Sequence, residues 1–186
     1  MKKILALILS FVFVISFSAC KDKEKANTNK VDIEYFANIG KIPESQFALG
    51  DKGDDIKKAL EEKHSDNESE DSYFDVIEGE KNVLITDGTY EYYYKKASAE
   101  KEIAYIVSYS DAYGFKLGDA LLEVKNSLKN YEIKEENVTA DNLFFYMGDI
   151  ANSNMITVEF EKNTVIFVFE NNALCATVIF SSENWK

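Results

Sequence analysis

Hydrophobic and polar positions follow two alternating patterns along the chain, one with helical spacing and one with strand spacing. Helical spacing occurs in residues 47–60 and again in residues 115–128. In each stretch the apolar residues share one helix face: Ile56, Ala59 and Leu60 in the first, and Leu121, Val124 and Leu128 in the second. Segments rich in β-branched and aromatic residues follow each stretch, and such segments favour strands.

Four strand-like segments follow each helical stretch. The first set reads YFDVI, NVLIT, TYEYYYK and EIAYIVSYS, and the second set reads LFFYM, MITVEFE, TVIFVFE and ALCATVIFS. Asp87-Gly88 separates the middle pair of the first set, and this dipeptide favours a two-residue hairpin turn. We therefore predict four antiparallel strands in each half of the chain.

The two helical stretches are also similar in sequence. FALGDKGDDIKKAL (47–60) and FKLGDALLEVKNSL (115–128) share a phenylalanine, two leucines, a glycine, an aspartate and a lysine at matching positions. In each stretch an aspartate, Asp51 or Asp119, follows the glycine, and we expect it to cap the helix N-terminus. Chance similarity between two amphipathic helices is the alternative explanation.

This order of elements predicts an α+β fold made of two tandem repeats. Each repeat would pack a short helical layer on a four-stranded antiparallel sheet. The first would span residues 31–112 and begin with an extra N-terminal helix, and the second would span residues 113–186.

Residues 1–19 have the features of a secretory signal: two lysines, an apolar run and small residues. The following FSAC, which ends at Cys20, resembles the lipobox of bacterial lipoproteins, in which the cysteine carries a diacylglycerol. Phe17 stands where leucine is usual, and an ordinary signal peptide is the alternative. Residues 20–30 contain no large apolar side chain, so we expect a flexible tether.

The FxLGD openings resemble those of the β-lactamase-inhibitor-protein-like (BLIP-like) fold, which is also found in small lipoproteins of the SmpA/OmlA type. GKIPESQFALGD (40–51) behind a lipobox resembles the YjgB-like lipoproteins, a group without an assigned activity. A glycine and a proline usual near the end of this helix are missing from both halves. The resemblance implies two helical layers on a curved antiparallel sheet whose other face is free to bind.

Composition narrows the possible partners. The 186 residues are 46% hydrophobic and 13% aromatic, enough for a substantial core. All 21 basic residues are lysines, against 33 acidic residues, and the net charge is -12. Nucleic-acid binding requires a cationic surface, so we expect no nucleic-acid partner.

Candidate catalytic groups are few, and we predict no enzyme and no cofactor. His64 is the only histidine and lies in a polar acidic segment, so neither a zinc site nor a histidine-activated nucleophile can be assembled in the usual way. Acidic residues in the loop 61–71 could bind a cation, but a solvated loop is favoured: Asp66, Glu68, Glu70 and Asp71. Cys175 lies in an apolar run, where a buried strand position is favoured over a reactive thiol.

Tyrosines on two neighbouring strands are candidates for a binding surface. If exposed on the sheet, they would offer half-apolar, half-polar contacts to a partner: Tyr90, Tyr92, Tyr94, Tyr105 and Tyr109. The alternative is that these rings form the edge of the core.

From these features we expect an exported protein, attached by lipid on Cys20 to the outer face of the bacterial cell membrane. It would recruit, scaffold or inhibit an envelope protein through a sheet face. A carrier of a small apolar or cell-wall ligand, held in a pocket between sheet and helices, is the alternative. A hydrolase using carboxylates is the least favoured.

Overall fold

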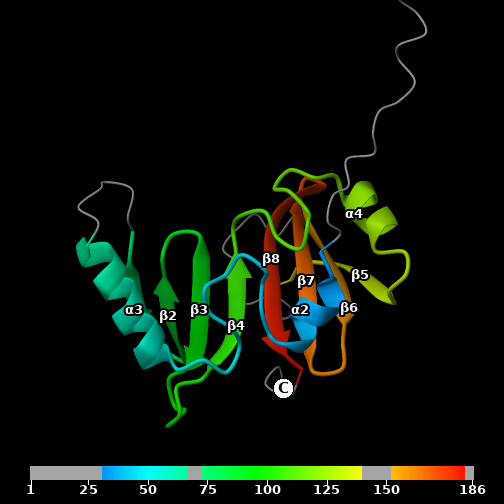
Figure 1. Ribbon diagram of the computed structural model, residues 1–186. Helices are drawn as coiled ribbons and strands as arrows, with labels where there is room; N and C mark the ends of the chain where they lie inside the picture. Colours follow the sequence, from blue (N-terminus) through cyan, green and yellow to red (C-terminus); the bar gives the residue numbers. More distant parts are fainter. Residues whose placement is uncertain (1–30, 67–72, 140–151, 183–186) are drawn as a thin grey trace, which may run out of the picture. The chain divides into compact units, whose positions relative to one another are not determined.

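Eight antiparallel strands build the core of the computed structural model, which describes residues 31–66, 73–139 and 152–182 (Figure 1). The strands are β1 (Asp75–Glu78), β2 (Asn82–Thr86), β3 (Tyr90–Lys95), β4 (Ile103–Ser108), β5 (Ile133–Asn137), β6 (Ser153–Glu159), β7 (Asn163–Glu170) and β8 (Ala173–Ser181). The helices are α2 (Ile33–Asn38), α3 (Gly53–Asp66) and α4 (Leu121–Ser127). All of these elements belong to one compact unit, Val31–Lys186.

The prediction of two repeats, each with its own four-stranded sheet and helical layer, is wrong. The strands form one continuous sheet in the order β1-β2-β3-β4-β8-β7-β6-β5. Strands β4 and β8 join its two halves through an antiparallel register that runs from Tyr105 opposite Phe180 to Ser108 opposite Thr177. Every residue of β4 is buried, as expected for a strand in the middle of a sheet rather than at an edge. The few short helices leave the fold mostly β.

Most predicted strands are found in the structure, and one strand was missed. Strands β2 and β8 coincide with NVLIT and ALCATVIFS. Strand β5 consists of IKEEN, a charged segment that is not among the predicted strands. It lies at the edge of the sheet, where charged side chains remain in solvent and discourage pairing with other chains. The predicted strand LFFYM lies outside the described residues.

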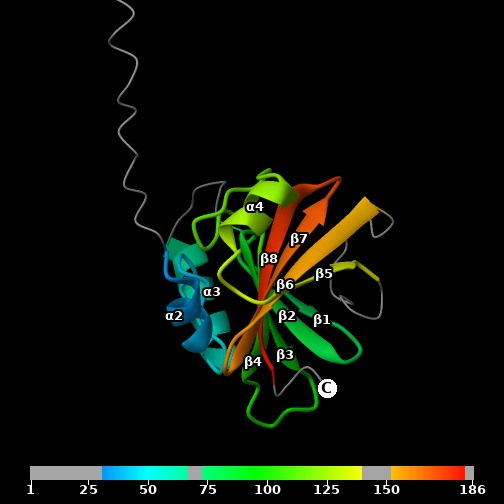
Figure 2. The same cartoon turned by 90° about the vertical axis from the view of Figure 1, so that its right-hand side faces the viewer.

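All three described helices pack on the same face of the sheet (Figure 2). Ile56 and Leu60 of α3 and Val124 and Leu128, in and just after α4, are buried there, as their helical spacing predicted. They join side chains from the middle strands in one apolar cluster that includes Tyr92, Ile106, Phe167 and Ile179. This cluster stabilises the unit by removing apolar surface from water.

The opposite face of the sheet carries a second apolar cluster. It includes Tyr93, Tyr105, Val107, Val168 and Val178, all of which are buried. Strand β7 is therefore covered on both faces. The expectation that this face is free to bind does not hold for these residues.

Asp51 and Asp119 do not cap helices as predicted. The Oδ2 atom of Asp51 accepts a hydrogen bond from the Ala48 N–H at 2.8 Å, and Asp119 accepts one from the Lys116 N–H at 2.8 Å. Their backbone carbonyls accept from the N–H groups of Ile103 and Leu174, and the helices begin two residues later, at Gly53 and Leu121. Each carboxylate therefore closes the turn behind it.

Within the described ranges, no helix is both long enough and apolar enough to cross a membrane. The predicted signal segment, tether and lipid attachment site Cys20 lie outside those ranges.

Candidate functional site

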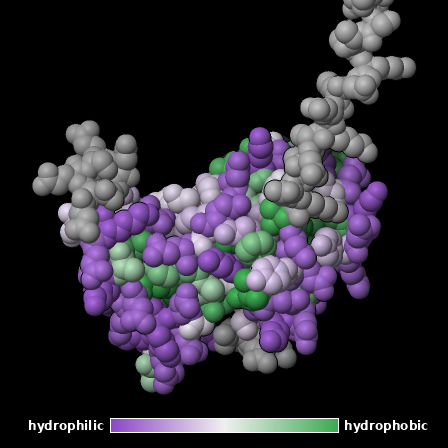
Figure 3. All heavy atoms as spheres, viewed as in Figure 1, coloured by the Kyte–Doolittle hydropathy of each residue, from purple (hydrophilic) through white to green (hydrophobic). Residues whose placement is uncertain are grey.

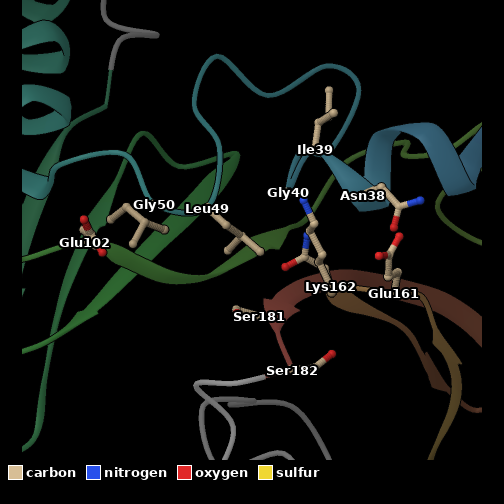
Figure 4. Close-up of a pocket in the computed structure, with 12 residues that line it drawn as sticks. Asn38, Ile39, Gly40, Leu49, Gly50, Glu102, Glu161, Lys162, Ser181 and Ser182 are labelled. Carbon is tan, nitrogen blue, oxygen red and sulfur yellow. The ribbon is translucent and has the colours of Figure 1, made fainter.

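A cavity of about 420 Å³ opens where α2, the segment after it and the hairpin between β6 and β7 meet (Figure 4). We call it the α2 pocket. Its lining residues are Asn38, Ile39, Gly40, Leu49, Gly50, Glu102, Ile103, Glu161, Lys162, Asn163, Ser181 and Ser182. Its volume falls in the lower part of the range of small-molecule sites, about 300–1,000 Å³.

The upper wall of the α2 pocket is the end of α2. The Gly40 N–H donates to the Ala37 carbonyl at 2.9 Å, and the Lys41 N–H donates to the Phe36 carbonyl at 3.0 Å. This pair of bonds ends the helix in a Schellman motif, which needs a left-handed residue, and Gly40 has φ of 70°. A Cβ atom at Gly40 would lie 2.9 Å from the Cβ of Leu49, so both conformation and space require glycine.

The floor of the pocket is the hairpin between β6 and β7. The side chain of Asn163 is buried, and its Nδ2 donates to the Ala37 carbonyl at 2.6 Å. The Ser182 N–H donates to the Lys162 carbonyl at 3.1 Å, so the end of β8 is fixed beside the hairpin. Asn163 thus ties the hairpin to the last turn of α2.

The pocket lies where strands β4 and β8 separate. Ile103, the first residue of β4, exchanges hydrogen bonds with the lead-in to α3 instead of with β8: it accepts from Gly50 at 3.0 Å and donates to Asp51 at 2.9 Å. The Leu49 N–H donates to the Gly40 carbonyl at 2.8 Å and closes the loop between α2 and α3. Separation of the two strands leaves the space that the pocket occupies.

One buried polar atom in the pocket has no hydrogen-bond partner. The Oδ1 atom of Asn38 is buried and accepts no hydrogen bond. Figure 4 shows this oxygen and the carboxylate of Glu161 pointing toward one another, so two acceptors face each other. A buried acceptor left unsatisfied costs about 1–3 kcal/mol. Among the described residues Thr177 Oγ1 is in the same condition, but it does not line this pocket.

The charged groups around the pocket are unequally paired. Glu102, at the end of the pocket away from Asn38, forms an ion pair with Lys52 at 3.0 Å. Glu161 and Lys162 are neighbours in the hairpin, and both are exposed. Neither forms an ion pair with another described residue. The pocket lining therefore includes one carboxylate and one ammonium that form no ion pair with another described residue.

The five tyrosines predicted to form one binding surface are divided between the two faces of the sheet. Tyr90 and Tyr92 belong to the helix-covered cluster and are 8% and 0% exposed, and the partly buried Tyr94 packs against it. The Tyr92 hydroxyl lies 3.2 Å from the hydroxyl of Ser45, and burial raises the pKa of Tyr92. These rings therefore form part of the core. This agrees with the alternative interpretation of the sequence, in which the tyrosines belong to the core and not to a binding surface.

Tyr105 and Tyr109 lie on the opposite face. Tyr105 is 6% exposed and stacks on Tyr93 with ring centroids 4.5 Å apart. The hydroxyls of Tyr93 and Tyr109 both donate to Oε2 of Glu91, at 2.7 and 3.2 Å. Burial, ahead of the bond to Glu91, raises the pKa of Tyr93. This cluster is internally bonded and offers little exposed tyrosine surface.

The remaining candidate groups show no catalytic arrangement in the described part of the chain. His64 lies near the end of α3, and its side chain is exposed. The Cys175 thiol donates to the Val168 carbonyl at 3.3 Å inside the sheet. No group of three or more His, Cys, Asp or Glu within these ranges could hold a metal ion. Glu68, Glu70 and Asp71 lie outside the ranges.

Large exposed apolar side chains are scattered. Figure 3 shows a mainly hydrophilic surface on the helix-bearing face, with small hydrophobic areas. Tyr35 in α2 and Ile39 at its C-cap are 57% and 47% exposed. Of these two, only Ile39 lines the α2 pocket.

Sequence reasoning missed the α2 pocket, although one signal was present. The tripeptide Glu-Lys-Asn occurs before β2, at residues 80–82, and before β7, at residues 161–163. Both copies form the same hairpin: Gly79 donates to the Asn82 carbonyl and Phe160 to the Asn163 carbonyl, each at 2.9 Å. The repetition marks two equivalent turns, but it does not show which asparagine bonds to the end of a helix.

Comparisons with protein-family models, curated proteins and solved structures find no match. The resemblance to YjgB-like lipoproteins therefore stays a prediction.

Proposed function

We propose that this protein is a lipid-anchored binding protein of the cell envelope, without enzymatic activity, that holds a small ligand in the α2 pocket. The ligand would carry a hydrogen-bond donor, most simply an amine or a hydroxyl. The envelope location rests on the FSAC sequence and Cys20. Mass spectrometry of the N-terminal peptide tests it, and an unmodified Cys20 would contradict it.

The unsatisfied Oδ1 of Asn38 is the observation that carries the ligand proposal. Buried polar atoms are nearly always bonded, so an exception that faces a cavity points to a missing partner. Because this oxygen is closed to solvent, a donor reaches it only when the exposed Glu161 side chain moves outward; an amine with two N–H bonds would then bond to both oxygens, and a hydroxyl to one of them. Rotation of the amide by half a turn would also remove it, without a ligand, and the experiments below separate the two.

We prefer the pocket to the tyrosine surface as the binding site because a ligand can reach the pocket in the folded protein but cannot reach most of the tyrosines. Tyr90, Tyr92 and Tyr105 are buried, so a partner could reach them only after the core opened. The α2 pocket is open in the folded protein and lined by polar and apolar groups together. It therefore supports the expected ligand carrier better than the expected protein-binding sheet, although its lining is more polar than an apolar ligand requires.

Thermal unfolding of the full-length protein in detergent tests this function. The probes are methylammonium, ethanolamine, L-leucine and glucose, each compared with sodium chloride. We expect at least one probe to raise the unfolding temperature of the native protein, because ligands that bind only the folded state stabilise it. Asn38→Leu removes the acceptor and should abolish this response.

Asn126→Leu is the matched control, because Asn126 lies in the last turn of α4 and is exposed. This variant should respond to the probes as the native protein does. The proposal fails if no probe stabilises the native protein, or if Asn38→Leu responds as strongly as Asn126→Leu.

A further inference from the structure

We infer that the α2 pocket recognises an α-amino acid group, binding its ammonium and its carboxylate together. This inference rests on the proposed function and names the ligand class. It follows from the order of charged and apolar groups around the pocket.

The ammonium end is formed by oxygen atoms from two separate elements. Asn38 Oδ1 comes from the last turn of α2, and the Glu161 carboxylate comes from the hairpin between β6 and β7. Figure 4 shows the two groups directed at one another. An ammonium has three N–H donors and no acceptor, so it can satisfy both oxygens at once, which a hydroxyl with one donor cannot.

The carboxylate end is formed by Lys162. Its side chain extends from the hairpin toward Gly40, beside the space in front of Glu161 (Figure 4). Glu161 and Lys162 both line the pocket, so it offers one carboxylate and one ammonium to a ligand. An α-amino acid carries an ammonium and a carboxylate on the same carbon and therefore needs both kinds of partner at one site.

The side chain of the ligand would meet an apolar wall. Leu49 lines the pocket next to Gly40, and Figure 4 shows its side chain on the pocket side of the loop. Glu102, at the far end, is already paired with Lys52 and is less available to a second cation. A medium-sized apolar or polar side chain therefore fits better than a second ammonium.

Two sources could supply this chemistry outside the cell. One is a free amino acid, and the other is a cell-wall peptide whose side chain ends in an uncapped α-amino acid group. The hairpin side of the pocket, at Glu161 and Lys162, is exposed and leaves room for a longer molecule to continue into solvent.

Isothermal titration calorimetry on the full-length protein tests the inference. The probes are L-leucine, N-acetyl-L-leucine, which lacks the ammonium, and 3-methylbutylamine, which lacks the carboxylate. We expect both analogues to bind at least about tenfold more weakly than leucine, since each loses a charge-assisted contact. Two tripeptides distinguish the two sources: alanyl-γ-glutamyl-diaminopimelate, and the same peptide amidated on the carboxylate beside the free amine of diaminopimelate. Tighter binding of the unamidated tripeptide than of leucine indicates the wall peptide, and amidation should weaken this binding.

Variants assign the two ends. Lys162→Met should lower leucine affinity by about tenfold and leave 3-methylbutylamine unchanged, whereas Glu161→Gln should weaken both. The controls are Lys81→Met and Glu80→Gln in the other Glu-Lys-Asn hairpin, and they should leave all affinities unchanged. Equal binding of leucine and 3-methylbutylamine, insensitive to Lys162→Met, would overturn the amino acid inference and leave an amine site intact. Absence of binding by every probe would overturn both proposals.

Discussion

The two Glu-Lys-Asn hairpins have the same sequence and the same backbone bonds, but only in the second does the asparagine side chain bond to the end of a helix, among the described residues. In the first hairpin the Lys96 N–H donates to the Lys81 carbonyl at 2.8 Å, and in the second the Ser182 N–H donates to the Lys162 carbonyl at 3.1 Å. Asn82 is half-buried, whereas Asn163 is buried and bonded to the end of α2. The local sequence sets the turn, and the element packed above it creates the pocket.

This difference also explains why the α2 pocket contains an arrangement that lowers the stability of the fold. Neither hairpin has an unsatisfied buried side-chain atom of its own among the described residues, but the second lines the same pocket as Asn38 of α2, whose Oδ1 is unsatisfied. The second brings a carboxylate against an amide oxygen, which a fold selected only for stability would avoid. Unfavourable local contacts of this kind are expected where a protein binds something.

The largest expected effect comes from disturbing the end of α2. Gly40→Ala forces a left-handed conformation on a residue with a side chain and places its Cβ against Leu49. We expect a loss of about 2–4 kcal/mol in the free energy of unfolding, measured by urea denaturation. Gly118→Ala is the control, since Gly118 also has positive φ but has open space around it, and it should cost only about 1–2 kcal/mol. Equal losses would mean that the contact with Leu49 is not tight.

Removing the link between hairpin and helix should have an intermediate effect. Asn163→Ala deletes a buried side chain that bonds the Ala37 carbonyl, and it should cost about 2 kcal/mol. The equivalent Asn82→Ala should cost about 0.5 kcal/mol, because Asn82 is only half-buried and its side chain forms no hydrogen bond with another described residue. Urea denaturation of the pair measures the contrast, and the interpretation fails if the two hairpins lose the same stability.

A smaller, pH-dependent effect should come from Tyr113, which anchors the segment after α2. Its hydroxyl donates to the Lys41 carbonyl at 2.9 Å, and burial raises its pKa. The unfolded chain ionises first, so this contribution is complete below about pH 10 and is lost as the pH rises above that value. Tyr113→Phe should cost about 1 kcal/mol at pH 7 and reduce the alkaline loss of stability. An unchanged alkaline slope in unfolding experiments would contradict this role.

Much of the secondary structure could be predicted from the sequence because it depends on local pattern. The buried faces of α3 and α4 and the bounds of β2 and β8 follow from the spacing of apolar residues. The single sheet could not be predicted in this way, because it depends on the pairing of β4 with β8 across about seventy residues.

The candidate binding site could not be predicted from local sequence pattern, for the same reason. Asn38 and Glu161 are far apart in sequence, and neither belongs to a recognisable motif. The tyrosines suggested a surface because alternation shows which residues share a face of a strand but not whether that face is covered. Tyr92 and Tyr105 have covered positions on opposite faces.

The unfolding free energy of Asn38→Leu, without added ligand, tests the central claim most directly. If the Asn38 oxygen is kept unsatisfied for a ligand, the Asn38→Leu substitution should stabilise the protein by about 1 kcal/mol relative to Asn126→Leu, since it removes a buried acceptor that has no partner. A loss of stability relative to that control would mean that the amide already bonds to Glu161, and that the α2 pocket has no vacant acceptor to offer.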